Sequence, residues 1–311
     1  MAGARFPDTT FLDHPPPEHT KTYDPAASLL TSKIGGTEVW NIGFMLILKC
    51  RPGYPGCDIE HDNTSMAHGL VDDKVKQEVG KTVASWEDDD GRFLILQERV
   101  RGQPLNDVIE YLSEEDLARI GWQLGEFLSH LKGCVSEDMK MGDGRPVIDR
   151  RLFKPSPPGE EAPDYTLCFT EDEVRENLAQ RLRGRMNDRI LNEFMARMPA
   201  TKPFTFSHSD IHGANIMVED GQFTGLIDWE LAGFYPEWWD FVNCCQTISD
   251  YLPKNIQREA ALRWFHVYAA IRDNEHDALV TRMNSVWTPQ RSVGLAAFSS
   301  KNGSISLTVI H

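Results

Sequence analysis

The 311-residue sequence has no long apolar run, no apolar leader and no excess of basic residues. No stretch approaches the ~20 consecutive apolar residues that a transmembrane helix requires. The N-terminal segment MAGARFPDTTFLDHPPPEH does not contain the apolar core of a signal peptide. We therefore expect a soluble, cytoplasmic protein that makes no contact with a membrane.

Cysteine is sparse, and its spacing shows no paired motif. The six cysteines are Cys50, Cys57, Cys134, Cys168, Cys244 and Cys245, with no CxxC pair among them. Because no secretion signal is evident, we expect these residues to be reduced thiols rather than disulfides.

Basic side chains are outnumbered by acidic ones. The chain has 32 Lys and Arg against 47 Asp and Glu, a formal net charge of −15. This balance disfavours a general affinity for nucleic acid or for anionic membranes. It would suit a cationic substrate, although solubility alone is a sufficient reason for it. The length has room for one two-lobed domain or two small ones, and 41% hydrophobic residues are ordinary for a soluble enzyme.

What the sequence does contain is a dense polar stretch between residues 206 and 230, FSHSDIHGANIMVEDGQFTGLIDWE. Three of its residues, Asp210, Asn215 and Asp228, are hard to explain as packing. Two short apolar runs flank Asp220-Gly221, a strong signal for a two-residue β-hairpin. The stretch therefore predicts a hairpin bordered by three oxygen-bearing side chains.

The hairpin also predicts how these side chains come together. If Asp220 and Gly221 form the turn, Asn215 faces Leu226, and Asp228 is a diagonal neighbour of Asn215, roughly 7–8 Å away by Cα. Two such side chains can hold one hard cation such as Mg²⁺. Asp210 precedes the hairpin in a loop and can approach the same point. This is the layout of a site that transfers a phosphoryl group from a metal-bound nucleotide.

The motifs His208-Ser-Asp210-Ile-His-Gly-Ala-Asn215 and Ile227-Asp228-Trp229-Glu230 resemble the signature of the aminoglycoside phosphotransferase/choline kinase-like enzymes. The resemblance implies a protein kinase-like α+β fold, with a small β-rich N-lobe and a larger helical C-lobe. It implies that Asp210 deprotonates the acceptor hydroxyl, and that Asn215 and Asp228 bind Mg²⁺ at the nucleotide phosphates.

The same resemblance assigns supporting roles to two further residues. His208 would tie the catalytic loop to the core, and Asp240 would be the buried acidic residue that braces this loop.

Lys49 closes the apolar run Phe44-Met-Leu-Ile-Leu-Lys49. A lysine in this position is often a solvated strand end, but the resemblance implies that it holds the nucleotide phosphates. The usual partner is a glutamate on the following helix. Glu60, which opens a helix-like stretch, is the expected partner, and Glu78 is the alternative.

Two other segments are candidates for nucleotide contact. Gly35 and Gly36 could place backbone N–H groups near phosphates, although a plain turn explains them equally well and the pattern is not GxGxxG. By resemblance, the backbone of Glu98 and Val100 would contact the adenine at the connector between lobes.

The rest of the pattern divides the chain into four segments. We expect a flexible lead-in over residues 1–25 and an unordered tail over residues 288–311. Between them, we expect the N-lobe over residues 26–100 and the C-lobe over residues 101–287.

Within the C-lobe, helices are expected over 113–132 and over 170–198, the latter interrupted near Gly184. An irregular insert over 133–169 separates them.

The sequence also lacks a segment corresponding to a protein-kinase activation loop or an APE-like element, which favours a small-molecule acceptor over a peptide. We therefore expect an ATP- and Mg²⁺-dependent phosphotransferase that acts on a hydroxyl group. ATP or GTP, the acceptor and the oligomeric state stay open.

Three alternatives stay open as well. One is an inert kinase-like nucleotide-binding or scaffold protein. Another is a metal-dependent hydrolase that uses His208, Asp210 and His212. The third is a different chemistry on the same scaffold.

Overall fold

The computed structural model describes residues 27–32, 36–53, 57–147, 170–244, 246–252, 256–272, 296–301 and 304–309. The expected lead-in over 1–25, the candidate phosphate-loop residue Gly35 and residues 148–169 of the insert lie outside these residues.

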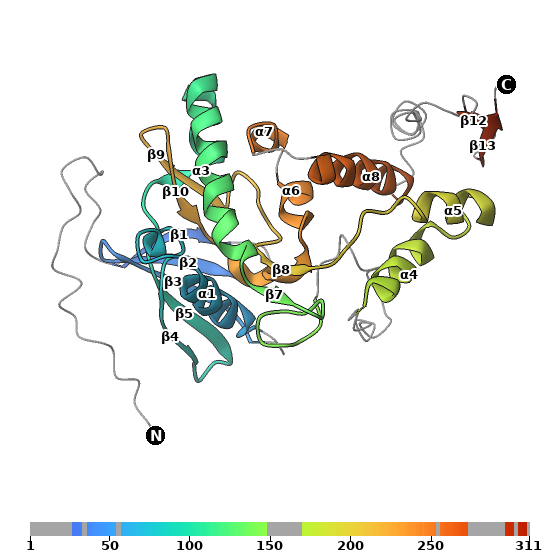
Figure 1. The fold of residues 1–311 in the computed structure, drawn as a ribbon. Coiled ribbons are helices and arrows are strands. Elements are labelled where there is room, and N and C mark those ends of the chain that lie inside the picture. The colour runs from blue at the N-terminus through green and yellow to red at the C-terminus, as the bar shows by residue number, and fades with distance from the viewer. Residues whose placement is uncertain are drawn as a thin grey trace.

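An antiparallel five-stranded sheet forms the N-terminal part of the structure, with the strand order β1-β2-β3-β5-β4 (Figure 1). Its strands are β1 (Ser28–Ser32), β2 (Glu38–Ile42), β3 (Leu46–Pro52), β4 (Thr82–Glu87) and β5 (Arg92–Glu98). Most of the apolar run that Lys49 closes lies on β3, which pairs antiparallel with β2. Because β3 is central, its backbone groups are paired on both sides, and its side chains are held in fixed directions.

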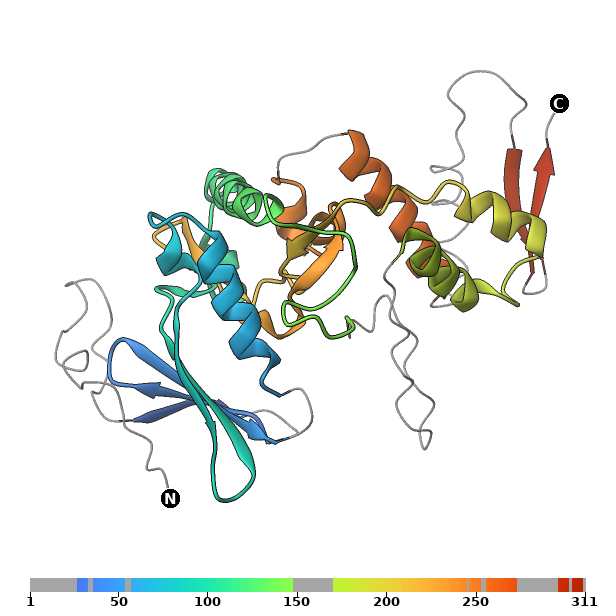
Figure 2. The same cartoon turned by 60° about the horizontal axis from the view of Figure 1, so that its bottom comes forward.

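Helix α1 (Ile59–Leu70) lies against this sheet and faces the second part of the molecule (Figure 2). It is the helix that the sequence predicts from Glu60 onward. Its Asn63 amide donates to the carbonyl of Trp229 (2.9 Å) and accepts from the backbone N–H of Gly142 (3.2 Å). Helix α1 therefore joins the sheet to the segments around Gly142 and Trp229. These contacts fix the position of the helix. A short 3₁₀ helix, η2 (Lys76–Glu78), leads into β4.

The second part of the structure is built around α3 (Glu114–Lys132), which follows β6 (Gln103–Pro104), α2 (Leu105–Val108) and η3 (Ile109–Tyr111). A capping box between Ser113 and Asp116 starts α3, which lies within the helix expected over 113–132. Its apolar face comprises Ile120, Leu124, Phe127, Leu128 and Leu131, which are buried, and Leu117, which is partly buried.

Two small sheets lie next to α3. One has the order β10-β9-β6 and the other β11-β8-β7. Their further strands are β7 (Val135–Ser136), β8 (Phe204–Ser207), β9 (Ile216–Glu219), β10 (Gln222–Leu226) and β11 (Gly233–Pro236), with η4 (Trp229–Leu231) between β10 and β11.

The remaining helices are α4 (Glu171–Leu182), α5 (Asp188–Met195), α6 (Trp239–Asn243), α7 (Gln246–Ser249) and α8 (Ile256–Arg272). The predicted break near Gly184 is confirmed, because this residue has a φ of 79° between α4 and α5. The large fully buried side chains Trp229, Trp239, Trp264, Tyr235 and Tyr268 belong to this part of the chain. Most of the largest buried side chains thus belong to the same part of the structure as the predicted site.

The expectation of an unordered tail over 288–311 is wrong for two segments. Strands β12 (Ala296–Lys301) and β13 (Ser304–Val309) form an antiparallel pair, at the end of the molecule away from the five-stranded sheet (Figures 1 and 2). The sequence carries the signal for this pair: Ser and Thr alternate with apolar residues in SISLTV, and Asn302-Gly303 separates the strands.

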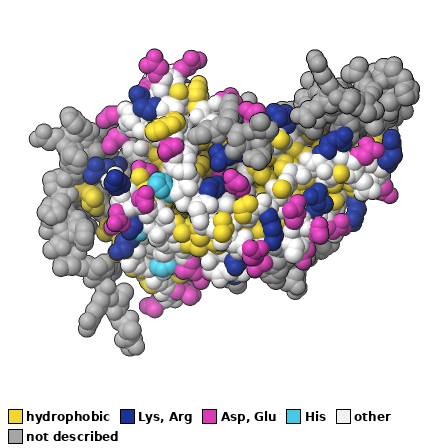
Figure 3. Space-filling model, viewed as in Figure 1, with side chains coloured by type: hydrophobic (Ala, Val, Ile, Leu, Met, Phe, Trp, Pro, Cys, Tyr) yellow, Lys and Arg dark blue, Asp and Glu magenta, His cyan; other side chains and the backbone are white. Residues whose placement is uncertain are grey.

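Acidic and basic side chains are interspersed on the face shown in Figure 3. The acidic excess of the chain is therefore not gathered into one patch on this face. Among the described residues, no helix is long and apolar enough to span a bilayer. The division of the chain at residues 100 and 101 stays a prediction; β5 ends at Glu98 and α2 begins at Leu105.

Candidate functional site

The predicted hairpin is present, but its register differs from the expected one. Asp220 and Gly221 have φ values of 50° and 68°, the left-handed conformation that a two-residue hairpin turn needs. Beyond Phe223, a bulge shifts the pairing by one residue, so Leu226 pairs with Ile216. The prediction that Asn215 faces Leu226 is therefore wrong.

Beyond the bulge, the N–H of Ile227 donates to the carbonyl of Asn215 (3.1 Å). Asp228 then adopts a left-handed conformation (φ 69°, ψ 66°). It leaves the hairpin through this turn and is not a diagonal sheet neighbour of Asn215.

Gly225 explains the bulge. Its φ is 151°, and a Cβ at this position would lie 2.2 Å from the carbonyl oxygen of Glu78. Only glycine allows the hairpin to approach η2 this closely. A glycine within an apolar run is a sequence signal for a bulge. The expected register assumed regular pairing and did not take this signal into account.

The loop before the hairpin brings Asp210 and Asn215 together. The Asn215 amide donates to the backbone carbonyl of Asp210 (3.0 Å) and to its carboxylate (3.2 Å). Asn215 is buried, whereas the Asp210 side chain is partly exposed. The amide nitrogen is thus used within the loop, and the amide oxygen is the atom of Asn215 that can ligate a cation.

His208 is buried beneath this loop and uses both ring nitrogens. Nε2 donates to the carbonyl of Ile227 (3.0 Å), and Nδ1 accepts from the N–H of Asp210 (3.2 Å). Burial lowers the pKa of His208, so the ring is neutral at physiological pH. With both nitrogens bound to backbone groups, His208 has no lone pair for a metal, which argues against the metal-dependent hydrolase.

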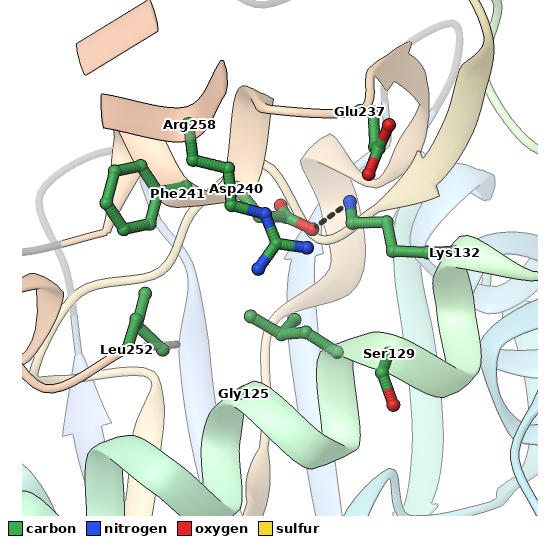
Figure 4. A pocket seen from close by; sticks show the side chains of 9 residues that line it. Gly125, Ser129, Lys132, Glu237, Asp240, Phe241, Leu252 and Arg258 are labelled. Carbon is green, nitrogen blue, oxygen red and sulfur yellow. Dashed lines mark hydrogen bonds and ion pairs between the residues drawn. The ribbon is translucent and has the colours of Figure 1, made fainter. Parts of the chain in front are cut away.

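Asp240 supports the same loop from below. Its carboxylate accepts from the N–H of Ser209 (3.0 Å) and from the ammonium of Lys132 (2.8 Å). Lys132 and Asp240 border a small cavity together with Ser129 and Arg258, as Figure 4 shows.

Ser209 has a φ of 68°, an unusual conformation for a residue other than glycine. Besides its N–H, which Asp240 binds, its hydroxyl accepts from the indole N–H of Trp239 (2.9 Å). These contacts hold the backbone directly before Asp210.

The N-terminal sheet supplies the ammonium group of Lys49 to the site. Lys49 lies on β3, is 9% exposed, and pairs with Glu60 and with Asp228 (3.2 Å). Burial alone would lower the pKa of Lys49, but the Asp228 and Glu60 carboxylates outweigh it and raise this pKa. The solvated strand end is therefore ruled out for Lys49, and its partner is Glu60. Glu78 lies on η2, where burial raises the pKa of its carboxyl to about 7.

Two charged residues that the sequence analysis did not single out belong to this cluster. Arg51 pairs with Glu60 and with Glu230 (3.0 Å). Carboxylate oxygens of Glu60, Asp228 and Glu230 lie within 4.8 Å of one another. Burial and the neighbouring Asp228 raise the pKa of Glu230, and Arg51 opposes this shift.

The family-level comparison agrees with this geometry. The model of the phosphotransferase enzyme family matches residues 73–279, which is more than half of the chain and includes both motifs. The chain belongs to the phosphotransferase enzyme family.

Individual relatives are more distant. An aminoglycoside 3'-phosphotransferase of Enterococcus faecalis is 32% identical over 62 residues, which is 20% of this chain and 24% of that protein. The match thus spans about a quarter of the length of this curated relative.

Solved structures of phosphotransferases share the fold over most of the chain. The GDP and kanamycin complex of APH(2")-IIIa is 13% identical, with a TM-score of 0.51, over 84% of this chain and 91% of that chain. A thermostable mutant of aminoglycoside phosphotransferase APH(4)-Ia with ADP and hygromycin B is 14% identical, with a TM-score of 0.50, over 86% and 95%. The kinase-like, two-lobed α+β fold is confirmed.

Within this family member, Trp229 explains why Asp228 and Glu230 reach the same place. The indole is 1% exposed, donates to the carbonyl of Leu226 (3.1 Å), and packs edge-on against His208 with 4.5 Å between ring centroids. An anchored residue between the two carboxylates restricts the backbone on both sides.

The roles expected for the remaining candidates for nucleotide contact stay predictions. The N–H of Glu98 donates to the carbonyl of Lys81 (2.8 Å), and Val100 is buried at the connector. Gly36 has a φ of 84° and lies next to Pro52.

Proposed function

We propose that this phosphotransferase is a small-molecule kinase, which transfers the γ-phosphoryl group of ATP to a hydroxyl group with the help of Mg²⁺. The observation that carries this proposal is the continuous set of contacts from the buried Lys49–Glu60 pair to Asp228 and from there to the Asp210 loop. Lys49 contacts Asp228, and Ile227 next to it is bonded to both Asn215 and His208.

The donor set fits Mg²⁺. Asp228 and Asn215 would hold the ion, since both offer the hard oxygen ligands that it prefers. Glu230 adds a carboxylate within 4.8 Å of the Asp228 oxygens. When bound, Mg²⁺ neutralises the charge that develops on the phosphate oxygens.

The other residues act directly on the reactants. Lys49 would place its ammonium on the nucleotide phosphates, oriented by Glu60. Asp210 would accept the proton of the acceptor hydroxyl. Its side chain is 26% exposed and contacts Asn215, so it is both accessible and oriented.

A small acceptor is favoured by the short path after the metal-binding motif. The chain runs from η4 through β11 directly into α6, so no segment in this part of the structure offers a platform for a peptide. The phosphotransferases of the solved structures bind kanamycin in one case and hygromycin B in another. We propose a small hydroxylated molecule as the acceptor, and no nucleic acid or membrane as a partner.

Two variants test the proposal by calorimetry with ATP, with and without Mg²⁺, and by a transfer assay against a panel of hydroxylated metabolites. Asp228→Ala should lose both Mg²⁺-dependent ATP binding and turnover. Asp210→Asn should keep ATP binding but lose about 10²–10⁴-fold in turnover, because an amide cannot accept the proton.

The exposed Asp250→Asn serves as the matched control and should behave as wild type. Equal ATP affinity of the wild-type protein with and without Mg²⁺ would refute the shared cation. A folded Asp210→Asn variant that no longer binds Mg·ATP would show that Asp210 is a metal ligand and not the base. Nucleotide binding without transfer to any acceptor would favour the inert scaffold.

A further inference from the structure

Arg51 occupies an unusual position for an arginine. It lies two residues after Lys49 on the central strand β3, so both side chains point to the same face of the sheet. Its side chain is only 5% exposed. A buried guanidinium on a central strand requires charged partners, since an unpaired buried charge is strongly unfavourable.

The first partner is Glu60, which Arg51 shares with Lys49. One carboxylate oxygen of Glu60 pairs with Lys49 and the other with Arg51. Glu60 is 0% exposed, so both of its oxygens depend on these two cations. Arg51 therefore fixes the orientation of the carboxylate that in turn holds Lys49.

The second partner is Glu230, on the opposite side of the site. The Arg51–Glu230 pair (3.0 Å) accompanies the Lys49–Asp228 pair (3.2 Å), and each joins residues that are 179 positions apart. The two pairs form a double connection between β3 and the segment from Asp228 to Glu230.

The charges explain why an arginine is needed here. Two cations, Lys49 and Arg51, face three carboxylates, and oxygens of these carboxylates lie within 4.8 Å of one another. A planar guanidinium can bind two carboxylates at once through separate nitrogens, which an ammonium does less well. Arg51 uses Nη2 for Glu60 and Nη1 for Glu230.

We propose that Arg51 is a positioning residue that orients Glu230, and with it the Asp228 segment, for the cation that accompanies the nucleotide. The inference rests on the proposed function, since it concerns the same cation. Toward this cation Arg51 acts through Glu230, whereas its pair with Glu60 orients Lys49, and it does not need to touch the reacting atoms.

The test measures how much Mg²⁺ is needed for half-maximal ATP binding, by calorimetry on the full chain. Partners of metal ligands typically change metal affinity by about 10- to 100-fold. We expect Arg51→Met to raise the Mg²⁺ requirement by this factor, and Arg51→Lys to have a smaller effect. Glu230→Gln, which leaves the Arg51–Glu60 pair intact, should reproduce the defect of Arg51→Met.

The double variant Arg51→Met/Glu230→Gln separates positioning from a merely structural role. If Arg51 acts through Glu230, the double variant is about as impaired as either single variant, since contacting residues of one network are non-additive. Effects that multiply, or an unchanged Mg²⁺ requirement in both single variants, would overturn the inference.

Arg92→Met is the matched control, because Arg92 is a half-exposed arginine of the same sheet that pairs with Asp88. It should leave the Mg²⁺ requirement unchanged. Should Arg51→Met not fold, as judged by thermal unfolding, Arg51→Lys and Glu230→Gln still decide the question. If wild-type protein binds ATP without any Mg²⁺ dependence, the proposed function fails and this inference fails with it. If Arg51→Met and Glu230→Gln both keep the Mg²⁺ requirement of the wild-type protein, only this inference fails.

Discussion

The two sides of the candidate site are held by different kinds of contact. On the N-terminal side, Lys49 and Glu60 are charged side chains that bind one another. On the C-terminal side, the buried side chains of His208 and Asp240 bind backbone groups of the loop that carries Asp210.

Because of this difference, the charged groups of the N-terminal side can exchange partners, whereas the loop of the C-terminal side keeps its shape. An ammonium can release one carboxylate for a phosphate oxygen without any change in the backbone. A loop whose N–H and C=O groups are bound by buried side chains cannot move without breaking those bonds in a dry environment. We infer that the phosphate side adapts when a nucleotide binds, and that the acceptor side is preformed.

The largest expected effect comes from removing the brace of the preformed side. Asp240→Ala leaves the Lys132 ammonium and the Ser209 N–H without their buried partner. Breaking a buried pair in this way costs about 3–5 kcal/mol in the free energy of unfolding. Urea unfolding followed by fluorescence measures it.

Two variants make this result a comparison between the sides. Asp240→Asn keeps an oxygen for Ser209 and should lose less stability. Lys49→Met removes a charge from the adaptable side, where Arg51 still pairs with Glu60, and should also lose less than Asp240→Ala. Equal losses for Lys49→Met and Asp240→Ala would show that the two sides do not differ as described.

A medium loss of stability is expected where Gly225 of the hairpin packs against Glu78 of η2. In Gly225→Ala, the new Cβ would meet the backbone oxygen of Glu78 at 2.2 Å, and backbone cannot yield as a flexible side chain does. Overpacking of this kind costs about 1–3 kcal/mol. Thermal and urea unfolding of the variant measure the loss. Gly69→Ala on α1, where no atom lies within 4 Å, is the control and should not be destabilised. An unaffected Gly225→Ala would mean that the bulge does not depend on this close approach.

The smallest expected effect is a pH dependence of stability that arises from the Glu78 side chain. Burial raises the pKa of its carboxyl from 4.5 to about 7 in the folded protein. The folded state therefore favours the protonated form, so the associated stability is present below pH 4.5 and is lost as the pH rises through 7. Because Glu78 is only half-buried, we expect a loss of about 1 kcal/mol.

Glu78→Gln isolates this effect. The variant cannot ionise, so it should match the wild type near pH 4.5 and be more stable by about 1 kcal/mol at pH 8. Urea unfolding at both pH values gives the difference. The prediction fails if the stability difference between variant and wild type is independent of pH.

The acceptor side was the more predictable of the two from sequence. The spacing from Asp210 to Asn215 and the turn at Asp220-Gly221 are local features, and local features determine a loop and a hairpin. The register beyond the turn was not predictable in the same way. It depends on Gly225 packing against Glu78, a residue from another part of the chain.

Each side of the site also contains a basic residue that its local sequence pattern does not distinguish. Arg51 and Lys132 are lone basic residues in ordinary strand and helix patterns. Only the tertiary structure brings Arg51 to Glu230 and Lys132 to Asp240. The pairing of β12 with β13 is a different case, since the alternation of SISLTV and the Asn-Gly dipeptide between the strands are visible in the sequence.

The double connection between β3 and the segment from Asp228 to Glu230 also bears on the order of folding. Both of its pairs span 179 residues, so neither can form until most of the chain has been synthesised. Until then, the cluster on β3 and α1 holds two cations, Lys49 and Arg51, against the single carboxylate of Glu60. This excess positive charge disfavours early burial of the cluster, and the charges of the N-terminal sheet are balanced only when the segment from Asp228 to Glu230 arrives.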